Sequence, residues 1–335
     1  MTQSHSFVLD QPVKKILIIR FSSIGDIVLT TPVIRCIKKQ MPHSIIHYLT
    51  KPAFQDILAS NPYIDKIVLL DKHPVTKGIE LQKEHYDLVI DLHHNLRTLL
   101  LKAALGVRSY SFPKLNIEKF LMVHFKINRL PKKHIVDRYF EPTQILGIKN
   151  DGEGLDYFIP EADQINVLES IQLLQTEYVC WAIGAQHFTK RLPVHKIIEA
   201  CRSTKLTIII LGGTNDVERG NEIKQALGDS CINACGKLNL NQSAWVIKNS
   251  LRLYTNDTGL MHIAAALKKP VTSFWGNTIP AFGMYPYYGK YTIENNIIEN
   301  NNLSCRPCSK IGFNRCPKGH FKCMEMLNVE VGNEK

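Results

Sequence analysis

The sequence lacks the marks of a membrane-spanning, exported or fibrous protein. None of its apolar runs approaches the ~18 residues needed to cross a bilayer. Its first fifteen residues contain no apolar segment of the kind found in secretory signals. Its nine cysteines in 335 residues are too sparse, and odd in number, for a disulfide scaffold. The regular apolar segments exclude a disordered chain, and the lack of repeats excludes a coiled coil. We therefore expect a soluble protein of the reducing cytoplasm.

What is present is the composition of a globular protein, with 44% hydrophobic and 21% charged residues, and a length that suits two domains. Short β-branched runs alternate with helical segments in both halves. The runs are almost continuously apolar, as expected for strands of a parallel sheet with helices on both faces. Strands are predicted at Lys14–Arg20, Ser44–Thr50, Lys66–Asp71, Asp87–His94, Tyr178–Gly184, Leu206–Gly213, Leu251–Asp257 and Pro270–Gly276. Helices are predicted at Ile27–Gln40, Val194–Arg202, Val217–Leu227, Ser243–Asn249 and Leu260–Lys268.

This alternation predicts an α/β fold with two Rossmann-like, doubly wound domains, residues 1–155 and 156–335. The segment Ile148–Asp163 is rich in Gly, Asp and Glu without helical period, which is typical of a hinge. The polar segment Asn295–Asn302 is predicted to be an exposed loop.

The net charge of +11 is concentrated in the first half of the chain. Residues 1–155 hold 22 Lys and Arg against 14 Asp and Glu. Within them, Arg97–Lys133 has nine basic residues, one acid and many Leu and Phe residues. A basic amphipathic stretch of this kind indicates a surface for an anionic partner, and equally a solvated helix face. Membrane headgroups and a phosphorylated substrate are the favoured partners. No nucleic-acid partner is expected, because the chain contains no recognised nucleic-acid module.

Four loops follow predicted strands, where open parallel sheets bind ligands. In the first, Ser22, Ser23 and Gly25 precede Asp26, whose carboxylate can cap the next helix or accept a proton from a substrate hydroxyl. The fingerprint G-x-G-x-x-G is absent, which disfavours a dehydrogenase.

The second loop carries Lys190 and Arg191, two cations that can neutralise a diphosphate or simply form a basic loop. In the third, Gly212 and Gly213 allow a nucleotide to lie against the backbone, or serve only as a turn.

The fourth loop carries the strongest signal. Its residues are Asn256, Asp257, Thr258 and Gly259, and they open an Ala-rich helix that contains His262. The first-turn N–H groups of such a helix form an anion site. The alternative is a capped core helix with a buried histidine.

Together these segments resemble the family 9 glycosyltransferases, the ADP-heptose:lipopolysaccharide heptosyltransferases. The segments that carry the resemblance are IIRFSSIGDIVLTTPVIRCIKKQMP, IGAQHFTKRLP, ILGGTNDVERGNEI and NDTGLMHIAAALKKPVTSFWG, with HIVDRYFEPTQILGI before the hinge. The likeness runs from about Lys14 to Met324. It implies a GT-B fold, two Rossmann-like domains facing across a cleft, with the acceptor bound by the first domain and the sugar nucleotide by the second.

The resemblance also implies roles for residues and an activity. Asp26 matches the general base, Ser22, Ser23 and Gly25 match its glycine-turn loop, and Lys190 matches the cation at the donor phosphates. Asp257, Thr258, Gly259 and His262 match the element that holds the nucleoside diphosphate and sugar. The implied activity is inverting, metal-independent transfer from an ADP-sugar to an anionic glycolipid at the inner face of the cytoplasmic membrane. The chain departs from the family at Leu192, where a Trp is frequent.

Two other functions remain open: a sugar-nucleotide epimerase on the same scaffold, and a non-catalytic nucleotide-binding or membrane-associated module. No catalytic cofactor is expected.

The cysteines divide into two groups. The thiols near the C-terminus are numerous enough for a structural zinc site, and free thiols or a redox disulfide are the alternatives; they are Cys305, Cys308, Cys316 and Cys323. The other five are expected to be buried in the core; they are Cys36, Cys180, Cys201, Cys231 and Cys235.

Overall fold

The computed structural model describes residues 13–164, 169, 177–202 and 204–332. The chain divides into two compact units. Unit 1 comprises Met1–Lys114 and Ile135–Phe158, and unit 2 comprises Leu115–His134 and Ile159–Lys335. The predicted border at 155 and 156 lies near the crossing after Phe158. The segment 115–134, predicted as part of the first domain, belongs to unit 2, where the Lys126 ammonium donates to the Pro307 carbonyl at 2.7 Å.

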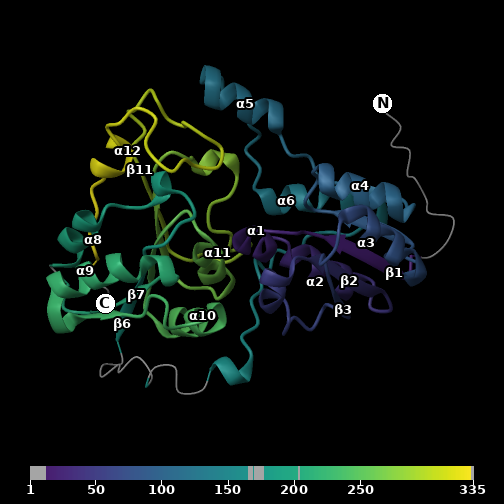
Figure 1. The fold of residues 1–335 in the computed structure, drawn as a ribbon, viewed down its shortest axis with the longest axis horizontal. Helices are drawn as coiled ribbons and strands as arrows, with labels where there is room; N and C mark the ends of the chain where they lie inside the picture. The colour runs from purple at the N-terminus through teal and green to yellow at the C-terminus, as the bar shows by residue number, and fades with distance from the viewer. Residues whose placement is uncertain (1–12, 165–168, 170–176, 203, 333–335) are drawn as a thin grey trace. The chain divides into compact units, whose positions relative to one another are not determined.

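Unit 1 is built on a five-stranded parallel sheet of order β3-β2-β1-β4-β5 (Figure 1). Its strands are β1 Lys15–Ile19, β2 Ile45–Thr50, β3 Lys66–Leu69, β4 Leu88–Asp91 and β5 Ser109–Ser111. Its helices are α1 Ile24–Val28, α2 Thr31–Gln40, α3 Pro74–Leu81, α4 Leu96–Leu105 and α6 Ile135–Tyr139, with short 3₁₀ turns at Pro52–Ile57, Gln82–Glu84 and Glu141–Leu146. Its core is formed by apolar side chains of β1, β2 and β4 that pack against α3 and α4, Leu17, Val89 and Leu101 among them.

Unit 2 is built on a six-stranded parallel sheet of order β11-β10-β9-β6-β7-β8. Its strands are β6 Tyr178–Ala182, β7 Thr207–Leu211, β8 Cys231–Asn233, β9 Leu253–Asn256, β10 Val271–Trp275 and β11 Asn295–Glu299. Its helices are α5 Asn116–Phe125, α8 Val194–Cys201, α9 Val217–Leu227, α10 Leu240–Asn249, α11 Gly259–Ala266 and α12 Lys322–Glu325. In the described part of the unit, 3₁₀ turns lie at Glu161–Asp163, Phe188–Lys190, Thr214–Asp216, Gly228–Ser230 and Pro280–Phe282. The predicted fold class, α/β with two doubly wound parallel sheets, is confirmed.

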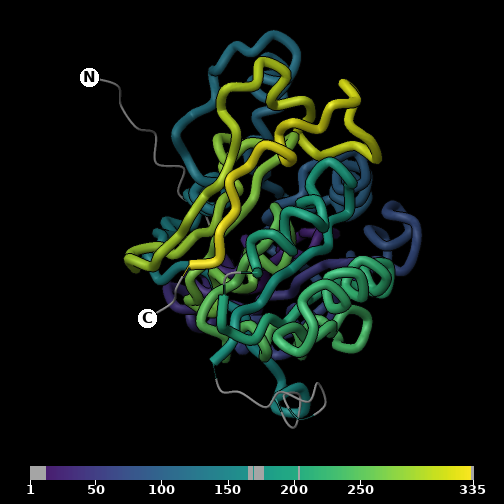
Figure 2. Tube along the Cα trace, turned by 90° about the vertical axis from the view of Figure 1, so that its left-hand side faces the viewer, coloured from purple at the N-terminus to yellow at the C-terminus, as the bar shows by residue number. Residues whose placement is uncertain are grey.

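An aromatic stack and the C-terminal segment cover one face of the second sheet. The Trp181 ring lies 5.0 Å from the Tyr254 ring and 5.6 Å from the Phe274 ring, all three stacked across β6, β9 and β10. Leu327, Val329 and Val331 pack into the same core cluster. Figure 2 shows this C-terminal segment in yellow, running beside the yellow-green strands. Among the described helices, none has both the length and the apolar character required to cross a membrane.

Two predicted elements need correction. The single helix predicted over Ile27–Gln40 is two helices, α1 and α2, and Pro32 lies in the first turn of α2. Proline has no N–H, and its ring clashes with the carbonyl four residues earlier, so an unbroken helix through Pro32 is disfavoured. The loop predicted at Asn295–Asn302 contains β11, which pairs with β10 from Asn295 to Glu299. β11 is a half-exposed edge strand, and its sequence NNIIE contains only two apolar residues. This is why the sequence pattern did not predict a strand there.

The predicted hinge is anchored to unit 1 over part of its length. The Arg35 guanidinium of α2 pairs with Asp151 at 2.8 Å, donates to the Gly154 carbonyl at 2.8 Å and pairs with Asp156. The Arg35 side chain is only 2% exposed. The part of Ile148–Asp163 that joins the two units therefore lies after Asp156.

Candidate functional site

Each sheet has its own switch point, where the strand order reverses, and three of the four predicted loops follow strands next to these switch points. In unit 1 the chain runs from β1 outward to β3, then returns beside β1 at β4. In unit 2 it runs from β6 outward to β8, then returns beside β6 at β9. Ligands of open α/β sheets bind beyond the carboxyl ends of the strands at this switch point. The loop after β1 lies at the switch point of unit 1, and the loops after β6 and β9 lie at the switch point of unit 2.

In unit 1, Asp26 lies in the first turn of α1, directly after β1. Its Oδ2 accepts hydrogen bonds from the Ser23 N–H at 3.1 Å and the Ser23 hydroxyl at 2.8 Å. The capping role that we gave as an alternative is therefore present. The carboxylate side chain is still 19% exposed, so solvent reaches it. Gly25 is buried and Ser22 is half-buried.

The second oxygen of this carboxylate, Oδ1, forms an ion pair with Arg20, a residue that was not predicted to belong to the site. Its Nη2 lies 2.6 Å from Asp26 Oδ1, and its Nε donates to the Ser22 carbonyl at 2.7 Å. Burial lowers the pKa of Arg20, but Asp26 and the neighbouring tyrosines more than compensate, so the pKa is raised above its ordinary value. A fixed charge of this kind holds the partner carboxylate in one orientation.

In unit 2, Lys190 and Asp257 come together from two different loops. Lys190 ends the 3₁₀ turn after β6, and its Nζ lies 2.6 Å from Asp257 Oδ2. The two side chains are 18% and 11% exposed. The Thr278 hydroxyl also donates to Asp257 Oδ2, at 2.9 Å. The neighbouring Arg191 donates from its Nε to the Ala185 carbonyl at 2.9 Å, and its predicted role at the diphosphate stays a prediction.

Asn256 fixes these two loops to each other. Its side-chain oxygen accepts from the Leu192 N–H at 3.0 Å, and its amide donates to the Ile183 carbonyl at 3.1 Å. Asn256 is completely buried, so these bonds are shielded from water. Leu192 is also completely buried, in the core of unit 2.

The two glycines after β7 differ in their surroundings. A Cβ at Gly212 would lie 2.8 Å from the Asp216 Cβ and 2.9 Å from the Cys235 sulfur, so Gly212 is required by packing. A Cβ at Gly213 would meet nothing within 4 Å, which leaves its surface open to a ligand. The Gly213 N–H donates to Asp216 Oδ2 at 3.1 Å.

Helix α11 begins at the fourth loop, with Thr258 as its N-cap residue. Thr258 and Gly259 are half-buried, whereas His262 is 2% exposed and lies on the buried face of the helix with the alanines 264–266. The alanines 264–266 are buried, so this face of the helix packs against its neighbours. A ligand at the start of α11 meets Thr258 and Gly259 before it meets His262.

A second arginine that the sequence analysis missed supports the Asp257 side of the site. The buried Arg306 guanidinium donates to the carbonyls of Gly276 at 2.5 Å and Thr278 at 3.0 Å, and pairs with Glu299 at 2.9 Å. It thereby fixes the loop after β10 that carries the Thr278 hydroxyl to Asp257.

The cysteines near the C-terminus do not form a metal site in this structure. Cys305 Sγ lies 3.9 Å from His320 Nε2, and the Cys308 thiol donates to the Cys305 carbonyl at 3.1 Å. Burial raises the pKa of Cys308 to about 11 and that of Cys323 to about 12. Within the described ranges, no three His, Cys, Asp or Glu side chains are placed to hold a metal ion. The zinc alternative stays a prediction, and the other five cysteines are buried as predicted.

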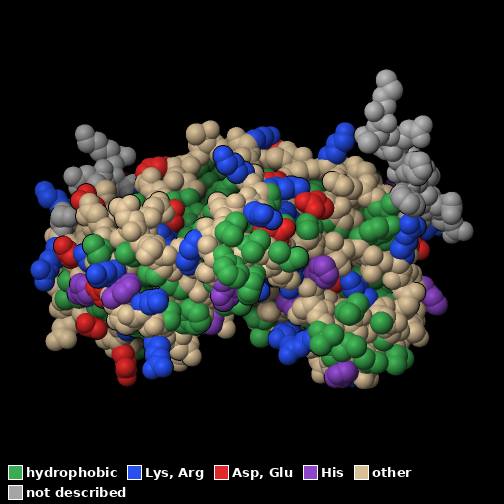
Figure 3. Space-filling view, turned by 90° about the horizontal axis from the view of Figure 1, so that it is seen from above, with side chains coloured by type: hydrophobic (Ala, Val, Ile, Leu, Met, Phe, Trp, Pro, Cys, Tyr) green, Lys and Arg blue, Asp and Glu red, His purple; other side chains and the backbone are tan. Residues whose placement is uncertain are grey.

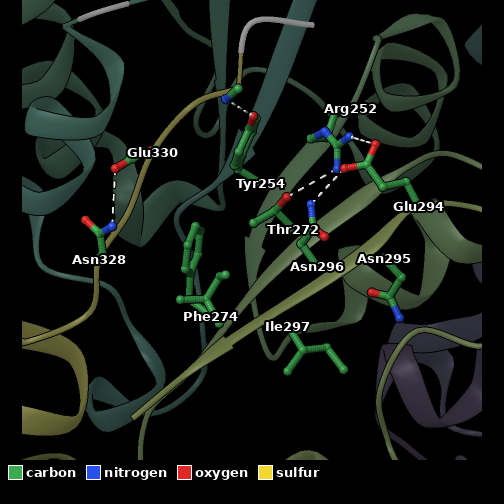
Figure 4. Close-up of a pocket in the computed structure, with 12 residues that line it drawn as sticks. Arg252, Tyr254, Thr272, Phe274, Glu294, Asn295, Asn296, Ile297, Asn328 and Glu330 are labelled. Carbon is green, nitrogen blue, oxygen red and sulfur yellow. Dashed lines mark hydrogen bonds and ion pairs between the residues drawn. The ribbon is translucent and has the colours of Figure 1, made fainter.

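A cavity of about 600 Å³ lies elsewhere in unit 2 (Figure 4). It is lined by strands β9 to β11 and by the C-terminal segment from Asn328 to Gly332. Arg252 and Glu294 form an ion pair in its wall. No residue predicted to belong to the site lines this cavity, so we do not place the activity there.

Comparison with known proteins agrees with the geometry. The sequence profile of glycosyltransferase family 9 (heptosyltransferase) matches residues 77–314. The chain is 27% identical to lipooligosaccharide heptosyltransferase 2 of Haemophilus influenzae, over 96% of this chain and 97% of that protein. It is 23% identical to lipopolysaccharide heptosyltransferase 2 of Escherichia coli, over 80% and 84%.

Solved structures show the same fold. The glycosyltransferase family 9 protein from Veillonella parvula superposes with a TM-score of 0.74 at 23% identity, covering 95% of this chain and 94% of that one. The E. coli ADP-heptose lipopolysaccharide heptosyltransferase II gives a TM-score of 0.69 at 20% identity, covering 93% and 98%. With its profile matched over more than half its length, the chain belongs to glycosyltransferase family 9 and is a glycosyltransferase.

Proposed function

We propose that this protein is an inverting, metal-independent glycosyltransferase that transfers a heptose-type sugar from an ADP-sugar to a lipopolysaccharide core or lipid A-type acceptor. The observation that carries the proposal is the Asp26 carboxylate, held by Arg20 and Ser23 at the switch point of unit 1 and still accessible to solvent. The named activities of the relatives support the substrate class.

In the proposed reaction, Asp26 accepts the proton of an acceptor hydroxyl as that oxygen attacks the anomeric carbon of the donor. The bond from the anomeric carbon to the diphosphate breaks on the opposite face, so the configuration inverts and ADP leaves. The reaction requires the acceptor held by unit 1 to reach the sugar held by unit 2.

Groups of unit 2 would stabilise the negative charge that develops on the leaving diphosphate. Lys190 supplies a cation, and the N-terminus of α11 at Thr258 and Gly259 supplies N–H donors and the positive end of the helix dipole. Preorganised donors of this kind stabilise a leaving diphosphate electrostatically, which is work that a divalent cation does in other transferases. Gly213 leaves room for the nucleoside, and a solved structure of the E. coli heptosyltransferase WaaC with ADP supports adenine as the base.

We also propose that the protein works at the cytoplasmic face of the inner membrane, where its glycolipid acceptor is anchored. Helix α5 supports this proposal because it has no buried residue. Ile117, Phe120 and Phe125 are 73%, 53% and 61% exposed. Residues 114–133 contain six Lys and Arg residues against one Glu. An exposed apolar face with basic residues around it is typical of a helix that lies on an anionic lipid surface.

Figure 3 views the molecule from above, so α5, which lies at the top of Figure 1, faces the viewer. Apolar side chains are grouped there, with Lys and Arg side chains beside them.

The test is a transfer assay with ADP-heptose and O-deacylated lipopolysaccharide from a heptose-deficient strain, read by mass spectrometry. We expect the acceptor to gain one heptosyl residue. Asp26→Asn should lower the rate by at least about 100-fold, the share of a positioned general base, while ADP still raises the melting temperature. Unchanged turnover in that variant would remove Asp26 from the role of base. Donor incubated without acceptor should stay intact, whereas an epimerase would convert it.

A further inference from the structure

The turn after β4 is the second loop at the switch point of unit 1, and it is tightly held. Asp91, the last residue of β4, is completely buried. Its Oδ1 accepts the backbone N–H groups of His93 at 3.0 Å and His94 at 2.7 Å, and its Oδ2 pairs with Lys102 at 2.8 Å. A buried carboxylate that accepts several hydrogen bonds from one turn fixes the backbone of that turn. The side chain of His93 therefore has a defined place.

The His93 imidazole has an unused hydrogen-bonding atom. Its Nδ1 is buried and has no hydrogen-bond partner in the described part of the chain. The ring packs against Phe21, with 5.0 Å between ring centres, and the residue as a whole is half-buried. Burial, followed by the charges of Arg20 and Lys114, lowers the pKa of His93 to about 4, so the ring is neutral at pH 7. Buried polar atoms are normally hydrogen-bonded, and an exception calls for a reason.

Arg20 ties this turn to the loop of Asp26. Its Nη1 donates to the Leu92 carbonyl at 2.5 Å, while its Nη2 pairs with Asp26 at 2.6 Å. Strands β1 and β4 are neighbours, so both loops emerge at the same edge of the sheet. One buried guanidinium thus fixes the carboxylate and the residue that precedes His93.

We propose that His93 binds the acceptor, through a hydrogen bond between its imidazole and an acceptor hydroxyl close to the one that Asp26 deprotonates. This inference rests on the proposed function. A neutral imidazole has one donor and one acceptor nitrogen, which suits a hydroxyl because a hydroxyl also donates and accepts. Because Nδ1 is occluded in this structure, binding would require a small shift of the imidazole, which would give that nitrogen its partner and orient the sugar toward Asp26.

The test compares wild type with His93→Ala and His93→Asn. Asparagine is the conservative variant, because its side-chain amide lies near the position of Nδ1. The probe is O-deacylated lipopolysaccharide from a heptose-deficient strain, with binding measured by titration calorimetry and transfer measured with ADP-heptose. For His93→Ala we expect the acceptor Kd and KM to rise about tenfold, the effect of one lost hydrogen bond. The donor KM and the melting temperature should stay unchanged, and His93→Asn should recover most of the acceptor affinity.

The outcomes separate the possible failures. An unchanged acceptor KM in a folded His93→Ala protein overturns the inference while the proposed function stands. A fall in melting temperature with donor and acceptor constants rising together, and no recovery in His93→Asn, also overturns it, because His93 would then act only on the fold. Wild-type protein that neither binds the acceptor nor transfers to it contradicts the proposed function itself.

Discussion

Arg20 and Asp26 form an ion pair at the switch point of the first sheet, with 2.6 Å between Nη2 and Oδ1. The arginine side chain is 9% exposed and the aspartate side chain 19%. The same guanidinium also reaches the Tyr139 hydroxyl at 3.0 Å. The candidate base Asp26 is thus held by an arginine whose own position is fixed by several hydrogen bonds.

Replacing Arg20 should therefore affect both activity and stability. In Arg20→Met the Asp26 carboxylate loses its partner, and because solvent reaches Asp26 the loss in stability should be smaller than the about 3–5 kcal/mol of a fully buried pair. We expect the transfer rate to fall at least tenfold, because an unanchored carboxylate no longer holds its geometry, and unit 1 to unfold at lower urea. Arg20→Lys should recover charge but not the several hydrogen bonds of the guanidinium. A Met variant with wild-type kcat would show that Asp26 is positioned by other groups.

Lys190 should matter for nucleotide binding more than its neighbour Arg191. In Lys190→Met, Asp257 loses its cation, and its charge then opposes a diphosphate instead of being balanced. We expect the Kd for ADP to rise more than about tenfold, as for the loss of a charged contact.

The matched control is Arg191→Met, which removes a cation whose Nε is already engaged by the Ala185 carbonyl. Titration calorimetry with ADP measures both variants. Equal losses of affinity would contradict the separate roles given to the two residues.

The central strands of both sheets could be predicted from the sequence because burial on both faces makes them nearly all apolar. β1, β2, β4, β6, β7, β9 and β10 all lie within predicted runs. The edge strand β3 also lies within a predicted run, Lys66–Asp71. The strands β5, β8 and β11 were missed, because each is only three to five residues long and none is a continuous apolar run.

The site was predictable only where its chemistry is local. The loops with Asp26, Lys190 and Asp257 could be found because a strand, a polar turn and a helix follow one another in the chain. The role of Arg20 could not be predicted, because it is the last residue of an apolar run and the Leu92 carbonyl that it contacts is 72 residues away in the chain. Arg306 contacts the Gly276 carbonyl from 30 residues away. Contacts of this kind depend on the fold, and a single sequence does not display them.

The apolar face of α5 should control binding to anionic lipid. The variant is the triple change of Ile117, Phe120 and Phe125 to Ser, with Ile79→Ser, a change at a residue 57% exposed on α3, as the matched control. Each buried side chain of this size contributes about 1.5–3 kcal/mol. We therefore expect the triple variant to bind phosphatidylglycerol vesicles at least tenfold more weakly in co-sedimentation.

Wild-type binding should also weaken as salt is added, because the basic residues act through screened charge. Vesicles of phosphatidylcholine alone should bind weakly. Equal binding by wild type and the triple variant would exclude α5 as the lipid contact.

The ion pair between Arg35 and Asp151 should make the stability of unit 1 depend on acid pH. Burial raises the pKa of Asp151, but hydrogen bonds and charge from Arg35 outweigh it and lower the pKa from 3.8 to about 2. A carboxyl with a lowered folded-state pKa stabilises the fold above its unfolded value, and this stability is lost as the pH falls from about 4 to about 2. The shift corresponds to at most about 2 kcal/mol.

Urea unfolding at several pH values, followed by circular dichroism, measures this dependence. Asp151→Asn should be less stable than wild type at neutral pH and should lose less stability between about pH 4 and pH 2. The control Asp56→Asn changes an exposed carboxylate of the same unit and should follow wild type. Because Trp181, Trp245 and Trp275 all lie in unit 2, their fluorescence reports that unit separately and should not respond to the Asp151 change. If Asp151→Asn has the same dependence of unfolding free energy on pH as wild type, the ion pair with Asp151 does not contribute to stability. The contacts of Arg35 with Gly154 and Asp156 would then be sufficient.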